Sequence, residues 1–181
     1  MLGPADLLSL LRLTLAVVLQ FALVRGGGLP ATLWVVAAAT DYLDGPLARW
    51  TGAVTWRGTV LDNVADIAFV LGGLTTAAAL GLVPWLVPAA ILLAVVDYAR
   101  ASLETSPRDA AGGLARSRTG HAAGVLNYAC LGVVCAGLAW PGSVPAMVPP
   151  TVELATVATN LGAVVMRVLR RNSWTGRSRA W

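Results

Sequence analysis

The sequence predicts an all-α integral membrane protein, a bundle of six transmembrane helices. Only 12% of the residues are charged and 57% are hydrophobic, whereas soluble domains carry about 25% charged residues. The mean hydropathy of +0.72 is too high for a chain that covers itself with polar surface. Apolar stretches also recur between turn-rich separators, and each is close to the roughly 20 residues that span a bilayer.

Six apolar stretches account for most of the chain. They are expected at residues 7–24, 29–48, 60–82, 84–103, 120–140 and 146–169. Their separators, in order, are RGGGLP, WTGAVTWRG, LVPW, ETSPRDAAGGLARSR and WPGSVP, rich in the Gly, Pro and Ser that end regular structure. We expect one transmembrane domain over residues 1–170 and a polar cytoplasmic tail over 171–181, which lies on anionic lipid.

The placement of arginine orients the bundle. All 13 basic residues are Arg, and they gather after the second, fourth and sixth stretches, whereas the separators after the third and fifth stretches hold none. By the positive-inside rule, both termini and the even-numbered separators are cytoplasmic. The sequence therefore predicts a multi-pass protein of the plasma membrane. Its pI near 9.8 suits anionic lipid headgroups, and we expect no nucleic-acid partner.

Four aspartates lie around the separator between the second and third stretches. Asp41 and Asp44 are three residues apart, and Asp62 and Asp66 are four apart, so each pair shares one helix face. Because the two stretches are antiparallel neighbours, the four carboxylates can converge. Neither face carries a Lys or Arg, so the carboxylates would repel one another without a cation. Oxygen ligands suit Mg²⁺ or Mn²⁺, and a pair of such ions is a recurrent device in phosphoryl displacement.

Small residues alternate with these aspartates. Gly45, Ala48 and Gly58 can line the carboxylate side and leave a slot for a ligand, and Arg49 is placed to hold a phosphate. Pro46 removes a helical hydrogen bond and predicts a kink or break just past Gly45. Ordinary solvated charges at two helix ends would not explain this ordered alternation.

The spacing resembles a known signature. D-x-x-D-G-x-x-A-R, eight residues, then G-x-x-x-D-x-x-x-D is the pattern of the CDP-alcohol phosphotransferases, and this chain fits every fixed position. Those positions are Asp41, Asp44, Gly45, Ala48, Arg49, Gly58, Asp62 and Asp66. The amino-terminal DLLSLLR, from Asp6 to Arg12, is similar to the family's N-x-x-T-x-x-R element, with Asp6 in place of Asn and Ser9 in place of Thr. The six-stretch layout also resembles the family over essentially the whole chain.

The resemblance implies an integral membrane enzyme with a cytoplasmic active site. In such an enzyme an acceptor alcohol attacks the β-phosphate of CDP-diacylglycerol and CMP leaves. It further implies that Asp41, Asp44, Asp62 and Asp66 bind two metal ions, that Asp66 is the general base, and that Gly45, Ala48, Arg49 and Gly58 contact the nucleotide. A homodimer is expected from the same resemblance.

The acceptor alcohol is less closely specified. Arg100 and the run Arg116, Arg118 and Thr119 are candidate acceptor-binding residues, and the run resembles an acceptor element of the glycerol-phosphate branch of the family, with Arg in place of Lys. The fragment ARA at residues 99–101 is similar to one in members that use inositol phosphate. We expect a phosphorylated polyol such as glycerol 3-phosphate. The alternatives are an inositol-phosphate-using member, a small ion transporter that uses the aspartates as a cation site, and a degenerate member without activity.

Overall fold

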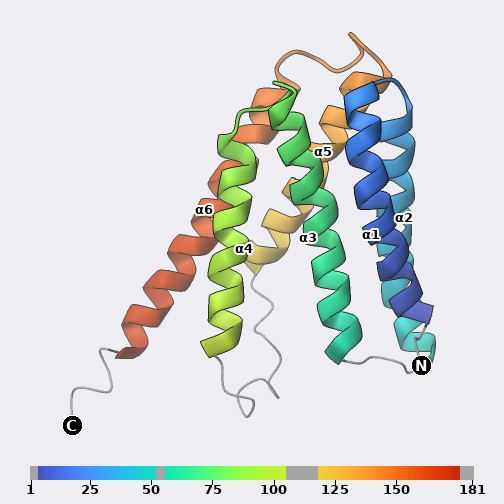
Figure 1. The fold of residues 1–181 in the computed structure, drawn as a ribbon. Coiled ribbons are helices and arrows are strands. Elements are labelled where there is room, and N and C mark those ends of the chain that lie inside the picture. The colour runs from blue at the N-terminus through green and yellow to red at the C-terminus, as the bar shows by residue number, and fades with distance from the viewer. Residues whose placement is uncertain (1–3, 52–55, 105–117, 176–181) are drawn as a thin grey trace.

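The computed structural model describes residues 4–51, 56–104 and 118–175. Within these ranges the chain forms six helices and no strand: α1 (Pro4–Arg25), α2 (Leu29–Thr51), α3 (Trp56–Ala79), α4 (Leu86–Glu104), α5 (Arg118–Ala139) and α6 (Val148–Thr175). The prediction of an all-α fold is confirmed, and each helix covers one of the predicted apolar stretches. Figure 1 shows that the helices run alternately up and down, so that both termini lie at the same end of the bundle.

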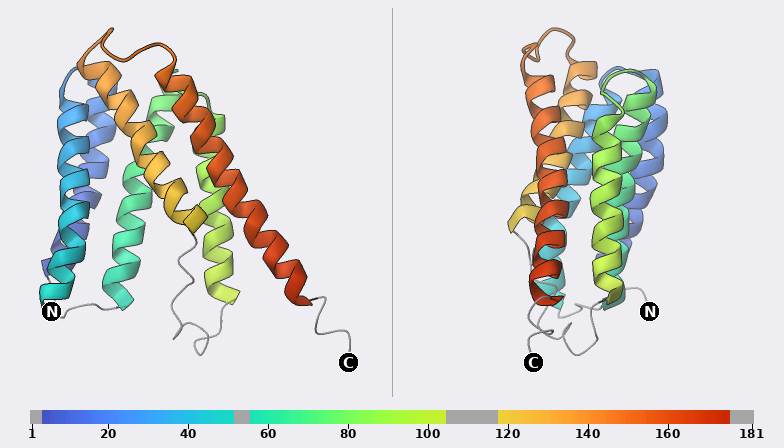
Figure 2. Two further views of the ribbon diagram at one scale, coloured as in Figure 1. Left: turned by 180° about the vertical axis from the view of Figure 1, so that it is seen from behind. Right: turned by 90° about the vertical axis from the view of Figure 1, so that its left-hand side faces the viewer.

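The helices pack in an order that differs from their order in the chain. α3 lies along α1, α2 contacts α1 and α5, and α6 contacts α4 and α5. Figure 2 shows α5 and α6 on one side of the bundle, with α1 and α3 on the other. Helix α1 is thereby the common neighbour of α2 and α3, the two helices that carry the aspartates.

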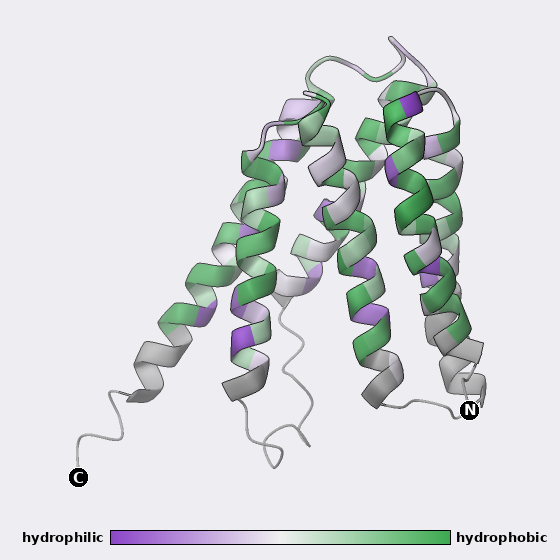
Figure 3. Cartoon of the chain, viewed as in Figure 1, coloured by the Kyte–Doolittle hydropathy of each residue, from purple (hydrophilic) through white to green (hydrophobic). Residues whose placement is uncertain are grey.

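The polarity of the bundle is that of a membrane protein. Large apolar side chains such as Phe21 and Leu154 are 66% and 71% exposed, whereas Arg12, Thr156 and Asn160 are buried. Figure 3 shows hydrophobic green over most of the helices, with hydrophilic bands on α3 and α4 in the lower half. Among the residues whose side chains are described, four helical segments are long and apolar enough to cross a membrane: 7–25, 60–79, 120–139 and 148–169. That α2 and α4 also span stays a prediction.

Two local predictions differ from the structure. Helix α2 continues through Gly45 and Pro46 to Thr51, so the chain does not break past Gly45, and the alternative of a kink there stays a prediction. Helix α6 runs to Thr175, so it includes the first part of the segment predicted as a tail.

The connection between α1 and α2 is three residues long and fixes the two helices side by side. Gly26 and Gly27 both have positive φ, 72° and 79°, a conformation that side chains with a Cβ adopt rarely. The Gly26 amide donates to the carbonyl of Ala22 at 2.9 Å and closes the end of α1. The turn therefore sets α2 antiparallel to α1.

Glycines let α5 approach its neighbours closely. A Cβ on Gly132 would lie 2.7 Å from Cζ2 of Trp34, and one on Gly73 would lie 2.9 Å from Cδ1 of Leu131. Small residues at helix crossings are typical of membrane bundles, where packing replaces the hydrophobic effect between helices. These two contacts join α5 closely to α2 and to α3.

Candidate metal-binding site

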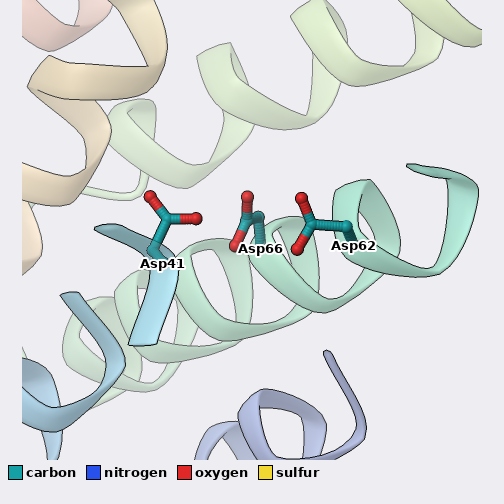
Figure 4. Close-up of side chains that lie close together, drawn as sticks. All are labelled: Asp41, Asp62 and Asp66. Carbon is teal, nitrogen blue, oxygen red and sulfur yellow. The ribbon is translucent and has the colours of Figure 1, made fainter. Parts of the chain in front are cut away.

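Three of the four predicted aspartates converge. Asp62 and Asp66 project from one face of α3, and Asp41 reaches toward them from α2 (Figure 4). One carboxylate oxygen of each lies within 4.8 Å of those of the other two. The i, i+4 spacing on α3 places its two carboxylates one above the other. The structure therefore brings together side chains that are up to 25 residues apart in the sequence.

Arg12 of α1 lies among these carboxylates. Its Nη1 is 2.8 Å from Oδ1 of Asp62 and 2.5 Å from Oδ1 of Asp66, and its Nη2 is 3.3 Å from Oδ1 of Asp41. The Arg12 side chain is fully buried, whereas the three carboxylates are 33–47% exposed. The sequence prediction considered only the charges on the faces of α2 and α3. Arg12 reaches the site from α1, so the carboxylates do have an arginine beside them.

The charge of the site fits a divalent cation. A guanidinium carries one positive charge at any relevant pH, so three ionised carboxylates around it retain two negative charges. The donors are hard carboxylate oxygens, partly exposed and within 4.8 Å of one another, as Mg²⁺ and Mn²⁺ prefer. The residues present therefore fit the predicted metal, since Asp41, Asp62 and Asp66 could each supply an oxygen ligand.

Several residues of the predicted site lie outside the part that the structure describes. Arg116 lies outside the described ranges, and only the helical backbone is described for Asp44, Gly45, Ala48, Arg49, Arg118 and Thr119. Gly58 is described and lies in the first turn of α3, partly buried. Arg100 is exposed near the end of α4, and it is not among the described residues that line the cavity next to the aspartates.

A cavity of about 740 Å³ adjoins the carboxylates. Asp41 and Asp66 stand on its wall together with Asn63, His121 and Asn127, and apolar side chains of α2, α3, α4 and α5 complete the lining. This volume is in the range that holds small-molecule ligands. The mixed lining can accommodate a ligand with one polar and one apolar part.

A second ion pair joins α4 to α6. Nε of Arg167 lies 3.2 Å from Oδ2 of Asp97, its Nη1 donates to the carbonyl of Ala94 at 3.5 Å, and its guanidinium lies 5.9 Å from the centre of the Tyr98 ring. Asp97 thus pairs with a residue 70 positions further along the chain. This contact fixes the register of α4 against α6.

Tyr128 of α5 also lines the cavity. Its ring stacks on Phe69, with centroids 5.8 Å apart, and its carbonyl accepts from Nε1 of Trp34 at 3.0 Å. Its hydroxyl is buried and has no hydrogen-bond partner among the described residues. A buried donor without a partner costs free energy, which marks this hydroxyl as a local weakness of the ligand-free protein.

Replacing Tyr128 with Phe is therefore expected to raise the stability of the ligand-free protein by about 1 kcal/mol, because the ring contacts stay and the unsatisfied group goes. Thermal unfolding in detergent measures the change. Tyr98→Phe is the matched control, since that side chain is 40% exposed and a surface change of this kind stays within roughly 0.5 kcal/mol. A loss of stability in Tyr128→Phe would contradict the expectation.

Sequence reasoning placed Arg12 in the DLLSLLR element but not beside the aspartates, and it did not single out Tyr128. Arg12 had a signal, since a charge that interrupts an apolar stretch has a partner in nearly every membrane bundle. Tyr128 had none, because an aromatic residue in an apolar helix is ordinary. Both reach the site through tertiary packing.

Comparison with known proteins defines the class of protein to which this fold and site belong. A family model described as CDP-alcohol phosphatidyltransferase matches residues 3–169. The chain belongs to the CDP-alcohol phosphatidyltransferase family.

Among its relatives are two proteins described as "Probable phosphatidylglycerophosphate synthase", from the Mycobacterium tuberculosis strains CDC 1551 / Oshkosh and ATCC 25618 / H37Rv. Each is 39% identical to this chain over 95 residues, a match that covers 49% of this chain and 46% of the relative. The matched part therefore spans about half the length of these relatives.

Proposed function

We propose that this chain is a membrane enzyme of phospholipid synthesis that transfers the phosphatidyl group of CDP-diacylglycerol to a phosphorylated alcohol and releases CMP. The observation that carries the proposal is the convergence of Asp41, Asp62 and Asp66 within 4.8 Å of one another in a chain of this family. The relatives named as phosphatidylglycerophosphate synthases favour glycerol 3-phosphate as the acceptor. Inositol phosphate is the alternative within the family.

In the proposed reaction the acceptor hydroxyl oxygen attacks the β-phosphorus of CDP-diacylglycerol. The bond from that phosphorus to the oxygen of CMP breaks, and CMP leaves with the bonding electrons. Asp66, which stands on the cavity wall, accepts the hydroxyl proton, because a carboxylate at hydrogen-bond reach is a competent base. The cavity lowers the reaction barrier further, because it holds the two substrates next to each other in position to react.

Two divalent cations, Mg²⁺ or Mn²⁺, are proposed at the carboxylates, with Asp44 as a further ligand. When bound, such ions neutralise the charge of the diphosphate and of the leaving group. Arg49 is proposed to hold a phosphate of the nucleotide, and Gly45, Ala48 and Gly58 are proposed to let the nucleotide approach the backbone. Arg100, Arg116, Arg118 and Thr119 are the proposed acceptor-binding residues.

The acceptor can be identified by testing candidate alcohols in parallel reactions. Labelled CDP-diacylglycerol is incubated with the purified protein, Mg²⁺ and, in separate reactions, glycerol 3-phosphate, inositol phosphate, inositol and serine. We expect CMP release and a lipid product with glycerol 3-phosphate, because arginine side chains bind phosphate in bidentate fashion. A product with inositol phosphate instead would identify the alternative acceptor, and product with unphosphorylated alcohols alone would contradict the proposal.

The proposed location is the plasma membrane, with six spans and with both termini and the active site cytoplasmic. Two features support this orientation: the arginine-rich separators follow the even-numbered helices, and both termini lie at one end of the bundle (Figure 1). Arg12 lies in the first half of α1, Asp41 in the second half of α2, and Asp62 and Asp66 in the first half of α3, so the site lies toward that same end. We also propose a homodimer, as the family resemblance implies, with membrane lipids around its apolar surface.

A further inference from the structure

Arg12 has no route to the surface of the bundle. It lies on the buried face of α1, one turn from Ser9 and one turn from Ala16, and none of these three is more than 3% exposed. Helix α1 packs along α3 over this face. The guanidinium is therefore held among the carboxylates and cannot extend into solvent, as an interfacial arginine would.

The contacts of Arg12 are the same carboxylates that are proposed to bind metal. Two of its nitrogens reach three of them at 2.5–3.3 Å. A cation bound by these oxygens would lie within a few ångströms of a fixed positive charge. Two like charges at such a distance in a partly buried site repel strongly. Arg12 and the metal thus compete electrostatically for one set of ligands.

We infer that Arg12 is a built-in cation that holds Asp41, Asp62 and Asp66 together without metal and weakens their affinity for divalent cations. The inference rests on the proposed function, because it takes the three carboxylates as metal ligands. Arg12 acts here through the carboxylates, as a positioning residue. The chemistry that it tunes is the binding of Mg²⁺ or Mn²⁺.

A structural role and an electrostatic role for Arg12 predict opposite changes in metal affinity. If Arg12 only shaped the site, its replacement would loosen the ligands and weaken metal binding. If its charge competes with the metal, a neutral replacement tightens binding. Arg12→Gln is the sharpest variant, because the amide still donates a hydrogen bond to a carboxylate while the positive charge is gone.

The experiment measures Mn²⁺ binding to the detergent-purified full chain in the absence of substrate. Binding is followed by the loss of the electron paramagnetic resonance signal of free Mn²⁺. Arg12→Gln is expected to bind Mn²⁺ roughly tenfold or more tightly than the unmodified protein. Arg12→Lys, which keeps the charge, is expected to stay within about threefold of the unmodified protein. Arg25→Gln is the control, since Arg25 is exposed at the end of α1, and it is expected to change nothing.

Thermal unfolding in chelator supplies a second readout. Arg12→Gln should unfold at a lower temperature than the unmodified protein. Added Mn²⁺ should raise the unfolding temperature of the variant most of the way back to that of the unmodified protein. Unchanged or weaker Mn²⁺ binding by Arg12→Gln would overturn the inference and leave the proposed metal site standing. No Mn²⁺ binding by the unmodified protein would overturn the proposed metal site and the inference with it.

Discussion

Replacing Asp66 with asparagine is expected to lower turnover by roughly 10²–10⁴-fold at saturating metal. Asparagine keeps the shape and one oxygen of the side chain but cannot accept the proton of the acceptor hydroxyl. The fold should survive, because Arg12 keeps its contacts with Asp41 and Asp62. The measurement is the steady-state rate of CMP release from CDP-diacylglycerol across a series of Mg²⁺ concentrations.

Glu153→Gln is the matched control for this substitution. It makes the same change from carboxylate to amide on α6, at a residue that does not line the cavity beside the aspartates, so its rate should equal that of the unmodified protein. Turnover of Asp66→Asn close to the unmodified rate at saturating metal would remove Asp66 from its proposed role. The proton would then pass to another of the clustered carboxylates.

Complete chelation of divalent cations is expected to abolish activity, and added Mg²⁺ or Mn²⁺ should restore it. The reason is electrostatic: two negative charges remain at the carboxylates after Arg12 is counted, and they repel an anionic diphosphate unless cations are present. The assay is CMP release before chelation, after it, and after each metal is returned.

Chelation should leave the fold intact. Arg12 holds the three carboxylates through its own contacts, so helicity measured by circular dichroism should not fall when the metal is removed. This measurement separates loss of the metal from loss of structure. Full activity after exhaustive chelation would contradict the metal-dependent reaction.

The sequence predicted the elements of this fold well because each element is encoded locally. Apolar stretches gave the six helices, and a glycine-rich separator gave the turn at Gly26 and Gly27. The four-residue spacing of Asp62 and Asp66 gave their shared face on α3. Of the predicted kink or break past Gly45, the break is absent, because a proline inside a long helix removes one hydrogen bond and favours a kink without having to end the helix.

The composition of the site was predictable only in part. Asp41, Asp62 and Asp66 come together because α2 and α3 both pack against α1. Arg12 depends on the packing of α1 along α3, and Tyr128 depends on the approach of α5 that Gly132 permits. No local pattern encodes such contacts between residues on different helices, so only the structure reveals them.

The site is assembled from helices near the amino terminus, with consequences for how the protein is made. Arg12, Asp41, Asp62 and Asp66 all lie in α1, α2 and α3, which leave the ribosome before the other three helices. Carboxylates at membrane depth are costly while they are alone. Arg12 enters the bilayer first, so each carboxylate meets a positive charge as soon as its helix is inserted. A single guanidinium thus offsets part of the carboxylate charge before α4, α5 and α6 are synthesised.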